Sequence, residues 1–368
     1  MTYLFLLFYY YYLPDRPFNR IDLNFSDASS SSAPNRMGFI GELGAMTLEL
    51  RYLAALTTNQ TAQSDWNAVL EHLRKLVSSS SSNGLYLLTL ESAFAIQSRL
   101  ASLSNDAHHF FGYLVRSSKQ TAGGDLQAMG MLAEGLAAAR RHGVLVENAT
   151  SGLVTVEDVD YASRAGEGIM KVGACQLAST LALAGKIRLA EALVESCVKL
   201  HLNVPTTAAA AGNHSSSNAT TTTTTTTASS IVPHGLPAAE VVFRGTAGRD
   251  IDRRGVLSPE LAESYFTLWR LTRKPLWRAR AWNLLLAINA TARVGFGSGG
   301  AGFSEVANVD YEDSRLTDYQ PAEFLGATLK YLYLTFSDFG TLPLDQWVFN
   351  AVGQPLPVCG TGPAYPKC

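Results

Sequence analysis

The stretch "GVLSPELAESYFTLWRL", residues 255–271, decides the fold because it carries the entry and the body of a helix in one run. Ser258 is a good N-cap, Pro259 suits the first helical position, and a glutamate in the first turn complements the helix dipole. The segment "RKPLWRARAWNLLLAI" follows after Thr272 with the same apolar rhythm. Together the two segments predict a helix, a short turn and a second helix.

The same pattern recurs along the chain. "MTLELRYLAALT" places Leu48, Tyr52, Leu53 and Leu56 on one helical face, and "WNAVLEHLRKL" follows a short polar gap. "CQLASTLALAGKIRLAEALVESCVKL" repeats the pattern with a tighter turn, and "ATLKYLYLTF" adds a further apolar helix. The unequal spacing of these units excludes a solenoid of equal repeats. Periodicity therefore predicts an all-α fold, a ring or bundle of helical hairpins.

Composition narrows the class of protein. The 368 residues are 47% hydrophobic and 16% charged, which is enough apolar material for a sizeable core. The formal net charge of −2 gives no electrostatic argument for nucleic acid or an anionic membrane, so we expect neither as a partner. No Cys-x-x-Cys or Cys/His spacing typical of zinc is present, which argues against a thiolate metal site.

Several features favour the secretory pathway. Four cysteines, an even count, are compatible with two disulfides in an oxidising compartment. Six Asn-x-Ser/Thr sequons agree with this: Asn24, Asn59, Asn148, Asn213, Asn218 and Asn289. The amino-terminal run "MTYLFLLFYYYYL" is shorter than the about 20 residues that span a bilayer. It is either a signal-peptide core that lacks a basic n-region and a cleavage site, or the buried end of a helix.

Three low-complexity stretches interrupt the helical pattern, at residues 29–32, 78–82 and 206–230. Such stretches bury too little apolar surface to offset their ordering entropy, so we expect surface loops. A long surface insertion carries a small closure cost and need not mark a domain boundary. We therefore expect one domain over residues 1–368.

Several segments in order resemble the class I α-mannosidases, glycoside hydrolase family 47. In the carboxy-terminal half these are "LSPELAESYFTLWRLT", "ATLKYLYLTFSD" and "LPLDQWVFNAVGQPLPV". Upstream they are "PFNRIDL", "GELGAMTLELRYLAALT", "FFGYLVR", "ACQLASTLALAG" and "GLPAAEVVF". The resemblance covers about residues 17–358. It implies an (α/α)7 barrel, a bound calcium, and trimming of α-1,2-linked mannose from high-mannose N-glycans in the endoplasmic reticulum or Golgi.

The resemblance also implies which carboxylates matter. The family hydrolyses with inversion, and an inverting pair stands roughly 6.5–9.5 Å apart to leave room for water. Glu260 and Glu263 are one helical turn apart and are not expected to be the two partners of one reaction. By resemblance Glu260 is the water-activating base and Glu263 faces the sugar. Glu240, in "GLPAAE", matches a further acid of the barrel interior, and the resemblance implies a catalytic role for it beside Glu260.

The cysteines divide into two pairs. Cys175 and Cys197 fall where the family carries its structural disulfide across a helical hairpin, although a free buried cysteine is the alternative. Closing this loop would contribute roughly 3 kcal/mol. Cys359 and Cys368 match no family position, and a terminal clip between them is left open.

The chain departs from the family in its acids. The family's general acid lies in a Phe-Glu-x-x-Ile-Arg helix well upstream of the segment matching "PFNRIDL". Only sixteen residues precede Pro17 and none is a glutamate, so the first barrel helices are expected to be missing. His108 stands at the position of the catalytic aspartate and Gly112 at that of the motif's glutamate. Asp106 is two residues out of register, about 200° away on a helix.

The calcium site departs as well. The family's "Phe-Asn-Thr-Glu" run is here Phe349, Asn350, Ala351 and Val352, so the threonine ligand is lost. Calcium takes six to eight oxygen ligands, and alanine offers no side-chain oxygen. Other polar family positions are replaced by apolar or smaller residues: Val172, Ser258, Ala327 and Gln354. We expect no calcium to be held and no other metal site.

Three functions follow. The first is a monomeric α-1,2-mannosidase, impaired because its acid, aspartate and calcium ligand are replaced. The second is a catalytically inactive relative that binds mannose-rich glycans in glycoprotein quality control. The third is a non-functional remnant whose ring cannot close and whose apolar faces stay unburied.

Overall fold

A computed structural model gives the structure of the chain. It describes residues 38–41, 47–57, 64, 71, 84–86, 89–90, 99–104, 107–202, 235–244, 251–295 and 302–361. The three low-complexity stretches lie outside these residues. The prediction of one domain therefore stays a prediction.

The described chain is built of helical hairpins. Their helices are α3 (Thr47–Thr57), α5 (Ala107–Gln120), α6 (Leu126–Arg141), α7 (Leu177–Leu183), α8 (Ile187–His201), α9 (Glu260–Thr272), α10 (Pro275–Thr291) and α11 (Leu329–Phe336). A 3-10 turn, η1 (Val172–Gln176), leads into α7, and a π-helical turn, η2 (Phe324–Thr328), leads into α11. The helices predicted from the other quoted segments are present, whereas "WNAVLEHLRKL", residues 66–76, lies outside the described residues except for residue 71.

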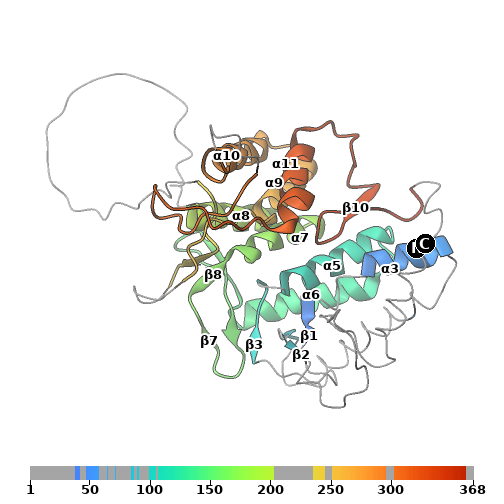
Figure 1. Cartoon of the computed structure of the whole chain (residues 1–368). Helices are drawn as coiled ribbons and strands as arrows, with labels where there is room; N and C mark the ends of the chain where they lie inside the picture. Colours follow the sequence, from blue (N-terminus) through green and yellow to red (C-terminus); the bar gives the residue numbers. More distant parts are fainter. Residues whose placement is uncertain are drawn as a thin grey trace, which may run out of the picture.

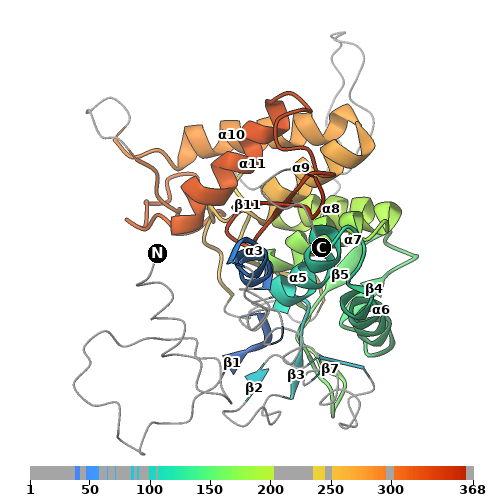
Figure 2. The same cartoon turned by 90° about the vertical axis from the view of Figure 1, so that its right-hand side faces the viewer.

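The helices form an inner and an outer layer. In the inner layer α3 contacts α5, α5 contacts α7, α7 contacts α9, and α9 contacts α11. In the outer layer α6 packs on α5, α8 on α7, and α10 on both α9 and α11. Figures 1 and 2 show α9, α10 and α11 together on one side of the molecule and α3, α5 and α6 on the other. This alternation of inner and outer helices is that of an α/α ring.

Short antiparallel strands join the hairpins. The pairs are β1 (Gly38–Phe39) with β2 (Thr89–Leu90), β4 (Leu145–Glu147) with β5 (Val154–Val156), β8 (Ile169–Lys171) with β9 (Glu240–Val242), and β10 (Trp347–Phe349) with β11 (Pro355–Pro357). A three-stranded sheet has the order β3 (Leu100–Ala101), β6 (Val159–Asp160), β7 (Ala165–Gly166). None of these strands exceeds three residues among the described ranges, so the fold remains helical in class.

The turn between α9 and α10 explains why the opening stretch folds as a hairpin. Arg273 ends α9 in the left-handed conformation, with φ of 60°, and its backbone N–H donates to the Trp269 carbonyl. Lys274 is extended and Pro275 begins α10, where its missing N–H costs nothing. The Arg270 guanidinium donates to the carbonyls of Leu334, Phe339 and Thr341 at 2.8–3.1 Å and so joins α9 to the end of α11.

An aromatic cluster ties the inner layer to the carboxy-terminal hairpin. Phe266 on α9, Tyr331 on α11 and Phe349 on β10 stand 5.4–5.6 Å apart by ring centroids. All three side chains are buried. The hairpin β10–β11 is thereby held against the inner helices, and its tip contacts Glu49 of α3 and Tyr113 of α5.

Among the described residues, none of the helices combines the length and the apolar character needed to cross a bilayer.

Candidate active site

Glu263 lies at the centre of a buried polar cluster on the inner layer. Its Oε1 accepts from Arg116 Nη2 at 2.5 Å and from Ser179 Oγ at 2.8 Å. Its Oε2 accepts from Gln176 Nε2 at 2.5 Å. The donors come from α5, α7 and η1, so one carboxylate of α9 joins three neighbouring elements. Because donors occupy both oxygens, the Glu263 side chain is fixed in one orientation.

Arg116 supplies the positive charge of this cluster. Burial is the largest influence and lowers the pKa of the guanidinium, but the opposing interactions, led by the Glu263 carboxylate, together outweigh it and the pKa is raised. Tyr113 and Tyr331 lie nearby, and burial raises the pKa of Tyr113 to about 12. Both phenols are therefore neutral and can only donate or accept hydrogen bonds. Arg116 also covers Gly112, where an added Cβ would meet its Nη1 at 3.3 Å.

Glu260 lies one turn before Glu263 and behaves differently. Its side chain is buried, with 9% of the residue exposed. Burial raises its pKa to about 7, Ser258 and the Glu260 amide oppose this, and the Glu323 and Glu263 carboxylates add to it. Its Oε2 is buried and accepts no hydrogen bond from the described residues. Glu260 is therefore a carboxyl that can exchange a proton near neutral pH.

The start of α9 corrects one expectation. Ser258 was expected to cap the helix, but the N-cap position belongs to Pro259 and no side-chain cap bond forms. Ser258 Oγ makes no hydrogen bond of good geometry with any residue in the described ranges. The Pro259 carbonyl accepts from the Glu263 amide at 2.8 Å instead. Ser258 is thus left beside Glu260 as a polar group of the site.

Glu240 is placed on a separate element. It begins β9, pairs with Lys171 of β8, and its Oε2 accepts from the Asp252 amide at 3.1 Å. Within the described ranges, no hydrogen bond or ion pair joins Glu240 to Glu260 or Glu263. The three predicted carboxylates thus fall into a close pair on α9 and one acid on the β8–β9 ribbon.

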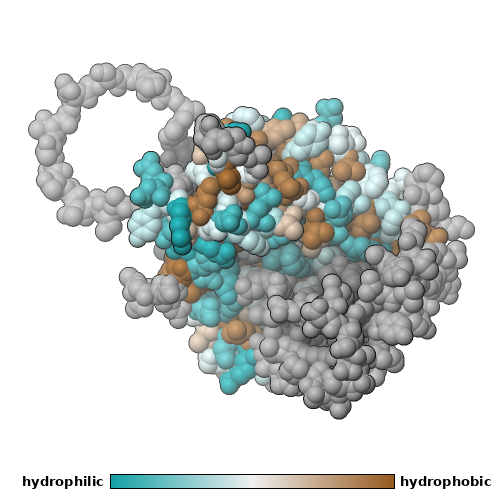
Figure 3. Space-filling view, in the orientation of Figure 1, coloured by the Kyte–Doolittle hydropathy of each residue, from teal (hydrophilic) through white to brown (hydrophobic). Residues whose placement is uncertain are grey.

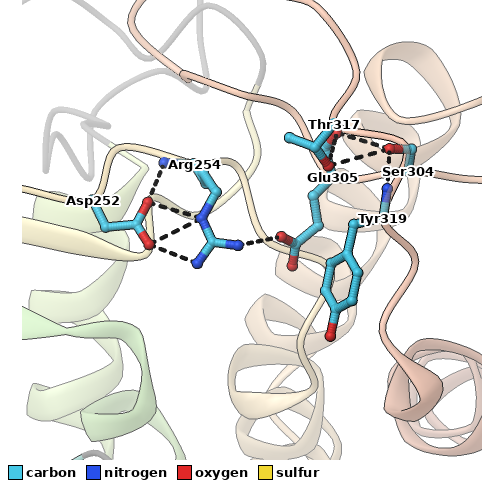
Figure 4. A network of polar contacts seen from close by, with 6 residues as sticks. All are labelled: Asp252, Arg254, Ser304, Glu305, Thr317 and Tyr319. Carbon is cyan, nitrogen blue, oxygen red and sulfur yellow. Dashed lines mark hydrogen bonds and ion pairs between the residues drawn. The ribbon is translucent and has the colours of Figure 1, made fainter.

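A polar network continues from the Glu240 side toward α9 (Figure 4). Arg254 holds Asp252 through bonds of 2.7–3.0 Å and reaches Glu305 Oε2 at 3.1 Å. The Glu305 carbonyl accepts from the hydroxyls of Ser304 and Thr317. Burial raises the pKa of Glu305, Arg254 lowers it, and Asp252 and Glu323 raise it further. Because Glu323 acts on both Glu305 and Glu260, the network and the α9 acids share one electrostatic environment.

The tip of the β10–β11 hairpin meets the cluster from the other side. Asn350 Nδ2 donates to Glu49 Oε1 of α3 at 2.6 Å, and the Ala351 amide donates to the Tyr113 hydroxyl at 3.2 Å. Asn350 Oδ1 accepts from the amides of Val352 and Gln354. Burial raises the pKa of Glu49, and Asn350 and Arg116 lower it. The polar groups of Asn350 and the Ala351 amide at the tip are therefore already hydrogen-bonded to other groups of the protein.

The residues at the tip do not fit calcium. Ala351 carries no side-chain oxygen, and Gly353 packs so close to Ala327 that an added Cβ would meet it at 3.0 Å. Lys330 Nζ donates to the Gly353 carbonyl at 2.8 Å, which places a positive charge there. No group of three or more His, Cys, Asp or Glu side chains suited to a metal occurs within the described ranges. Oxygen ligands for a divalent ion are thus replaced by packing and an ammonium group.

His108 does not replace the charge of the missing aspartate, because a neutral imidazole carries no negative charge. It lies at the start of α5, buried, with its ring 4.0 Å from that of His109. Burial, His109 and Arg116 lower its pKa well below the usual range, so the imidazole is neutral. Asp106 lies outside the described residues.

A small cavity lies beside the Arg116–Glu263 pair. Its volume is about 20 Å³, room for about one water molecule. Tyr331, Phe266 and Trp347 are among the residues that line it. A mannose ring cannot enter this space, so a sugar would have to approach Glu260 from outside the cavity.

One of the two disulfide expectations is confirmed. Cys175 and Cys197 form a disulfide with their Cα atoms 6.0 Å apart, which joins η1 to α8 as expected. Cys359 is also disulfide-bonded. Cys368 lies outside the described residues. The possible disulfide between Cys359 and Cys368 therefore stays a prediction.

Sequence reasoning missed the partners of these acids. Arg116, Gln176, Ser179 and Glu49 all lie within the segments quoted for the resemblance, as polar residues inside apolar helices. A buried polar group needs a hydrogen-bond partner, so polar residues inside apolar helices are candidates for a buried polar site. The spacing of residues along the sequence does not show which of them pair across the inner layer.

The alternating inner and outer helices, with carboxylates at the start of α9 on the inner layer, form the arrangement of an α/α barrel. The chain belongs to glycosyl hydrolase family 47, whose family model matches residues 7–358. It is 27% identical over 353 residues to mannosyl-oligosaccharide α-1,2-mannosidase IA of Drosophila melanogaster, covering 93% of this chain and 47% of the relative. It is 25% identical over 367 residues to mannosyl-oligosaccharide 1,2-alpha-mannosidase MNS3 of Arabidopsis thaliana, covering 92% and 56%.

A solved structure confirms the fold. The α-1,2-mannosidase from Trichoderma reesei superposes with a TM-score of 0.70 at 16% identity, over 89% of this chain and 67% of that one. The predicted all-α barrel of helical hairpins is therefore confirmed. The chain spans about half the length of the curated relatives that it matches over most of its own length.

Proposed function

We propose that this chain is a glycoside hydrolase of the α-1,2-mannosidase type, acting with inversion on high-mannose N-glycans, with its hydrolysis impaired. The observation that carries the proposal is Glu260, a buried carboxyl whose pKa is raised to about 7 at the entrance of α9. A catalytic base works best with a pKa near the operating pH. Glu260 suits the activation of water.

The other site residues act through position. Glu263 is held by three donors and orients Arg116 and Gln176 around the sugar-facing side of α9. Glu240 and the Asp252–Arg254–Glu305 network supply polar groups on the ribbon and the loop beside it. An inverting reaction also needs an acid that protonates the leaving oxygen. Glu323 is a carboxylate near enough to raise the pKa of Glu260. No contact among the described residues places Glu323 across a substrate from Glu260 as the acid. Because the acid is not accounted for, we propose that hydrolysis is impaired.

A second candidate is a catalytically inactive relative that binds mannose-rich glycans in glycoprotein quality control. The closed hairpin tip favours it, because Ala351, Gly353 and Lys330 occupy the place where the resemblance implies calcium. Neither candidate uses a metal. The disulfides at Cys175–Cys197 and Cys359 support an oxidising compartment for both, the endoplasmic reticulum or Golgi. We further propose a monomer.

The two candidates separate in one experiment. The purified chain is incubated with a fluorescently labelled high-mannose glycan, and free mannose and glycan binding are measured in parallel. Slow release that Glu260→Gln abolishes supports the hydrolase. The control is Glu147→Gln, since Glu147 is exposed on β4 and pairs only with Arg140 among the described residues. Binding without release supports the inactive relative, and absence of both refutes the two proposals.

A further inference from the structure

The loop between β4 and β5 carries an Asn-x-Thr sequon, the sequence that N-glycosylation requires. It consists of Asn148, Ala149 and Thr150, directly after β4, and all three residues are exposed. Of the other sequons, the one at Asn289 lies on α10, and the remaining four lie outside the described residues. The structure therefore allows two sequons to be compared.

The β4–β5 loop is closed by hydrogen bonds within residues 148–153. The Asn148 amide donates to the Leu153 carbonyl, and the Gly152 amide donates to the Asn148 carbonyl, both at 2.8 Å. Gly152 has a φ of 67°, a left-handed conformation that glycine adopts without strain. Because all of these groups belong to one loop, the turn needs no distant part of the chain and can form during synthesis.

The side chain of Asn148 is oriented by the same loop. Its Oδ1 accepts from the Thr150 amide at 2.9 Å and from the Ser151 amide at 3.0 Å, which is an Asx turn. Its Nδ2, the atom that takes a glycan, makes no hydrogen bond with any described residue, and neither does the Thr150 hydroxyl. Both groups of the sequon are thus available to a transferase.

The hairpin beneath the loop is anchored to two helices. The Arg140 guanidinium of α6 contacts the Glu147 carboxylate at 2.8 Å, and the Val154 amide of β5 donates to Ser196 Oγ of α8 at 2.7 Å. Figure 2 shows β4 and β5 beside α6, with α9, α10 and α11 above them. A glycan on the loop would therefore extend into solvent without covering Glu260 on α9.

The sequon on α10 lacks this arrangement. Asn289 and Thr291 belong to the last turn of the helix, and the Thr291 hydroxyl donates to the Ala287 carbonyl at 2.8 Å. Leu286, one turn before Asn289, is 49% exposed, and Figure 3 shows hydrophobic residues on this part of the surface. The hydroxyl of this sequon is occupied, and the helix must unwind before the sequon can form a turn.

We propose that Asn148 carries an N-linked oligosaccharide in preference to Asn289, a modification that rests on the secretory compartment proposed above. In an oligosaccharyltransferase, Asn148 Nδ2 attacks C1 of the first sugar of an oligosaccharide carried on a lipid diphosphate. The C1–O bond to the diphosphate breaks and an N–C1 bond forms. One Nδ2 proton is released, and the lipid diphosphate leaves with the electron pair, so no oxidant or reductant is needed.

Site-resolved mass spectrometry tests the modification. The full chain is expressed behind a cleavable signal peptide in insect cells, and chains from which the signal has been removed are collected. Peptide N-glycosidase in isotopically labelled water then marks each asparagine that carried a glycan. We expect occupancy at Asn148 to be at least about fivefold that at Asn289. An unmodified Asn148, or equal occupancy at the two sites, would overturn the proposal.

Two matched glycine variants test the role of the turn. Gly152→Val disfavours the turn but keeps the sequon, and nothing beyond the chain neighbours lies within 4 Å of an added Cβ there. Gly185→Val is the control, because Gly185 has a φ of 78° and equally open surroundings between α7 and α8. Occupancy at Asn148 should fall at least about threefold in Gly152→Val and stay unchanged in Gly185→Val. Because occupancy is read on peptides, a poorly folded variant still answers, and equal occupancy in the two variants would refute selection by the turn.

The modification and the proposed function can fail separately. Asn148→Gln should lose the glycan at this position and keep the mannose release or glycan binding of the wild-type chain, because Asn148 lies on the β4–β5 loop and not on α9. A chain that is glycosylated at Asn148 but neither releases nor binds mannose would refute the proposed function alone. An active or glycan-binding chain without a glycan at Asn148 would refute the modification alone.

Discussion

Arg116 on α5 and Glu263 on α9 form an ion pair at 2.5 Å in which the side chains are only 2% and 3% exposed. The pair is 147 residues apart in sequence. Gln176 and Ser179 satisfy the carboxylate further, so the charge of Glu263 is fully compensated. Removing either partner would leave a buried charge without its counterpart.

The Arg116→Met variant should therefore lose about 3–5 kcal/mol of unfolding free energy. Urea denaturation measures the loss. The matched control is Arg140→Met, because the Arg140–Glu147 pair has side chains 42% and 53% exposed and should cost less than about 1 kcal/mol. The Arg116→Met/Glu263→Met double variant should recover much of the loss. Equal effects of the two single variants would contradict the role of the buried pair.

The raised pKa of Glu260 makes stability depend on pH. The folded carboxyl keeps its proton up to about pH 7, whereas the unfolded one loses it near 4.5. The folded state binds more protons between these values, so its stability falls as pH rises through that window and is constant above it. The loss is up to about 3 kcal/mol. Melting curves at pH 5 and pH 7.5 should differ for the wild-type chain and much less for Glu260→Gln.

Two glycines of α6 provide a matched pair of substitutions. A Cβ on Gly135 would meet Phe111 Cε1 at 2.7 Å and Tyr86 at 3.1 Å, whereas nothing lies within 4 Å of one on Gly130. Gly135→Ala should cost about 1–3 kcal/mol through overpacking. Gly130→Ala should stabilise by about 0.5–1 kcal/mol, because alanine is the better helix former. The same sign for both in thermal denaturation would refute the packing at Gly135.

The disulfide between Cys175 and Cys197 should stabilise the η1–α8 connection. The Cys175→Ser/Cys197→Ser variant should lose about 3 kcal/mol, the entropy of a loop with a sequence separation of 22. Guanidinium denaturation without reductant measures this difference. With reductant present the wild-type chain and the variant should converge, since both then lack the bond. A difference that persists would assign the effect to the packing of the thiols.

The hairpin tip should be insensitive to divalent ions. Calcium or a chelator should leave the melting temperature unchanged. The reason is that Lys330 Nζ already binds the Gly353 carbonyl, and the Asn350 side chain already binds Glu49. Lys330→Met should lower the unfolding free energy by about 1 kcal/mol through the lost bond to Gly353. A chelator-sensitive melting temperature would contradict this arrangement.

Local features of the fold were readable from the sequence. The apolar rhythm of residues 255–291 gave two helices and their short turn, and the structure places them at α9 and α10. Pro275 opens α10, where its missing backbone N–H costs nothing. Ser258 did not follow helix-start chemistry, because Pro259 occupies the N-cap position in its place.

The site was readable only in part. Glu260, Glu263 and Glu240 were found by resemblance, but their partners lie on other elements, and a period of 3.6 residues reports a face and not what it contacts. Arg116 reads in the sequence as one basic residue of a helix, because its contact with Glu263 depends on how α5, α7 and α9 are arranged in the inner layer. The π-helical turn η2, which sets the position of Glu323, has no local sequence signal that distinguishes it from an α-helix.

The bond from Asn350 to Glu49 joins residues 301 positions apart. Synthesis proceeds from the amino terminus, so α3 emerges long before the β10–β11 hairpin that completes its polar contacts. Contacts of such separation form slowly, because a long loop must close first. The site can therefore assemble only after the β10–β11 hairpin has been synthesised, and until then the Glu49 side chain lacks its Asn350 partner.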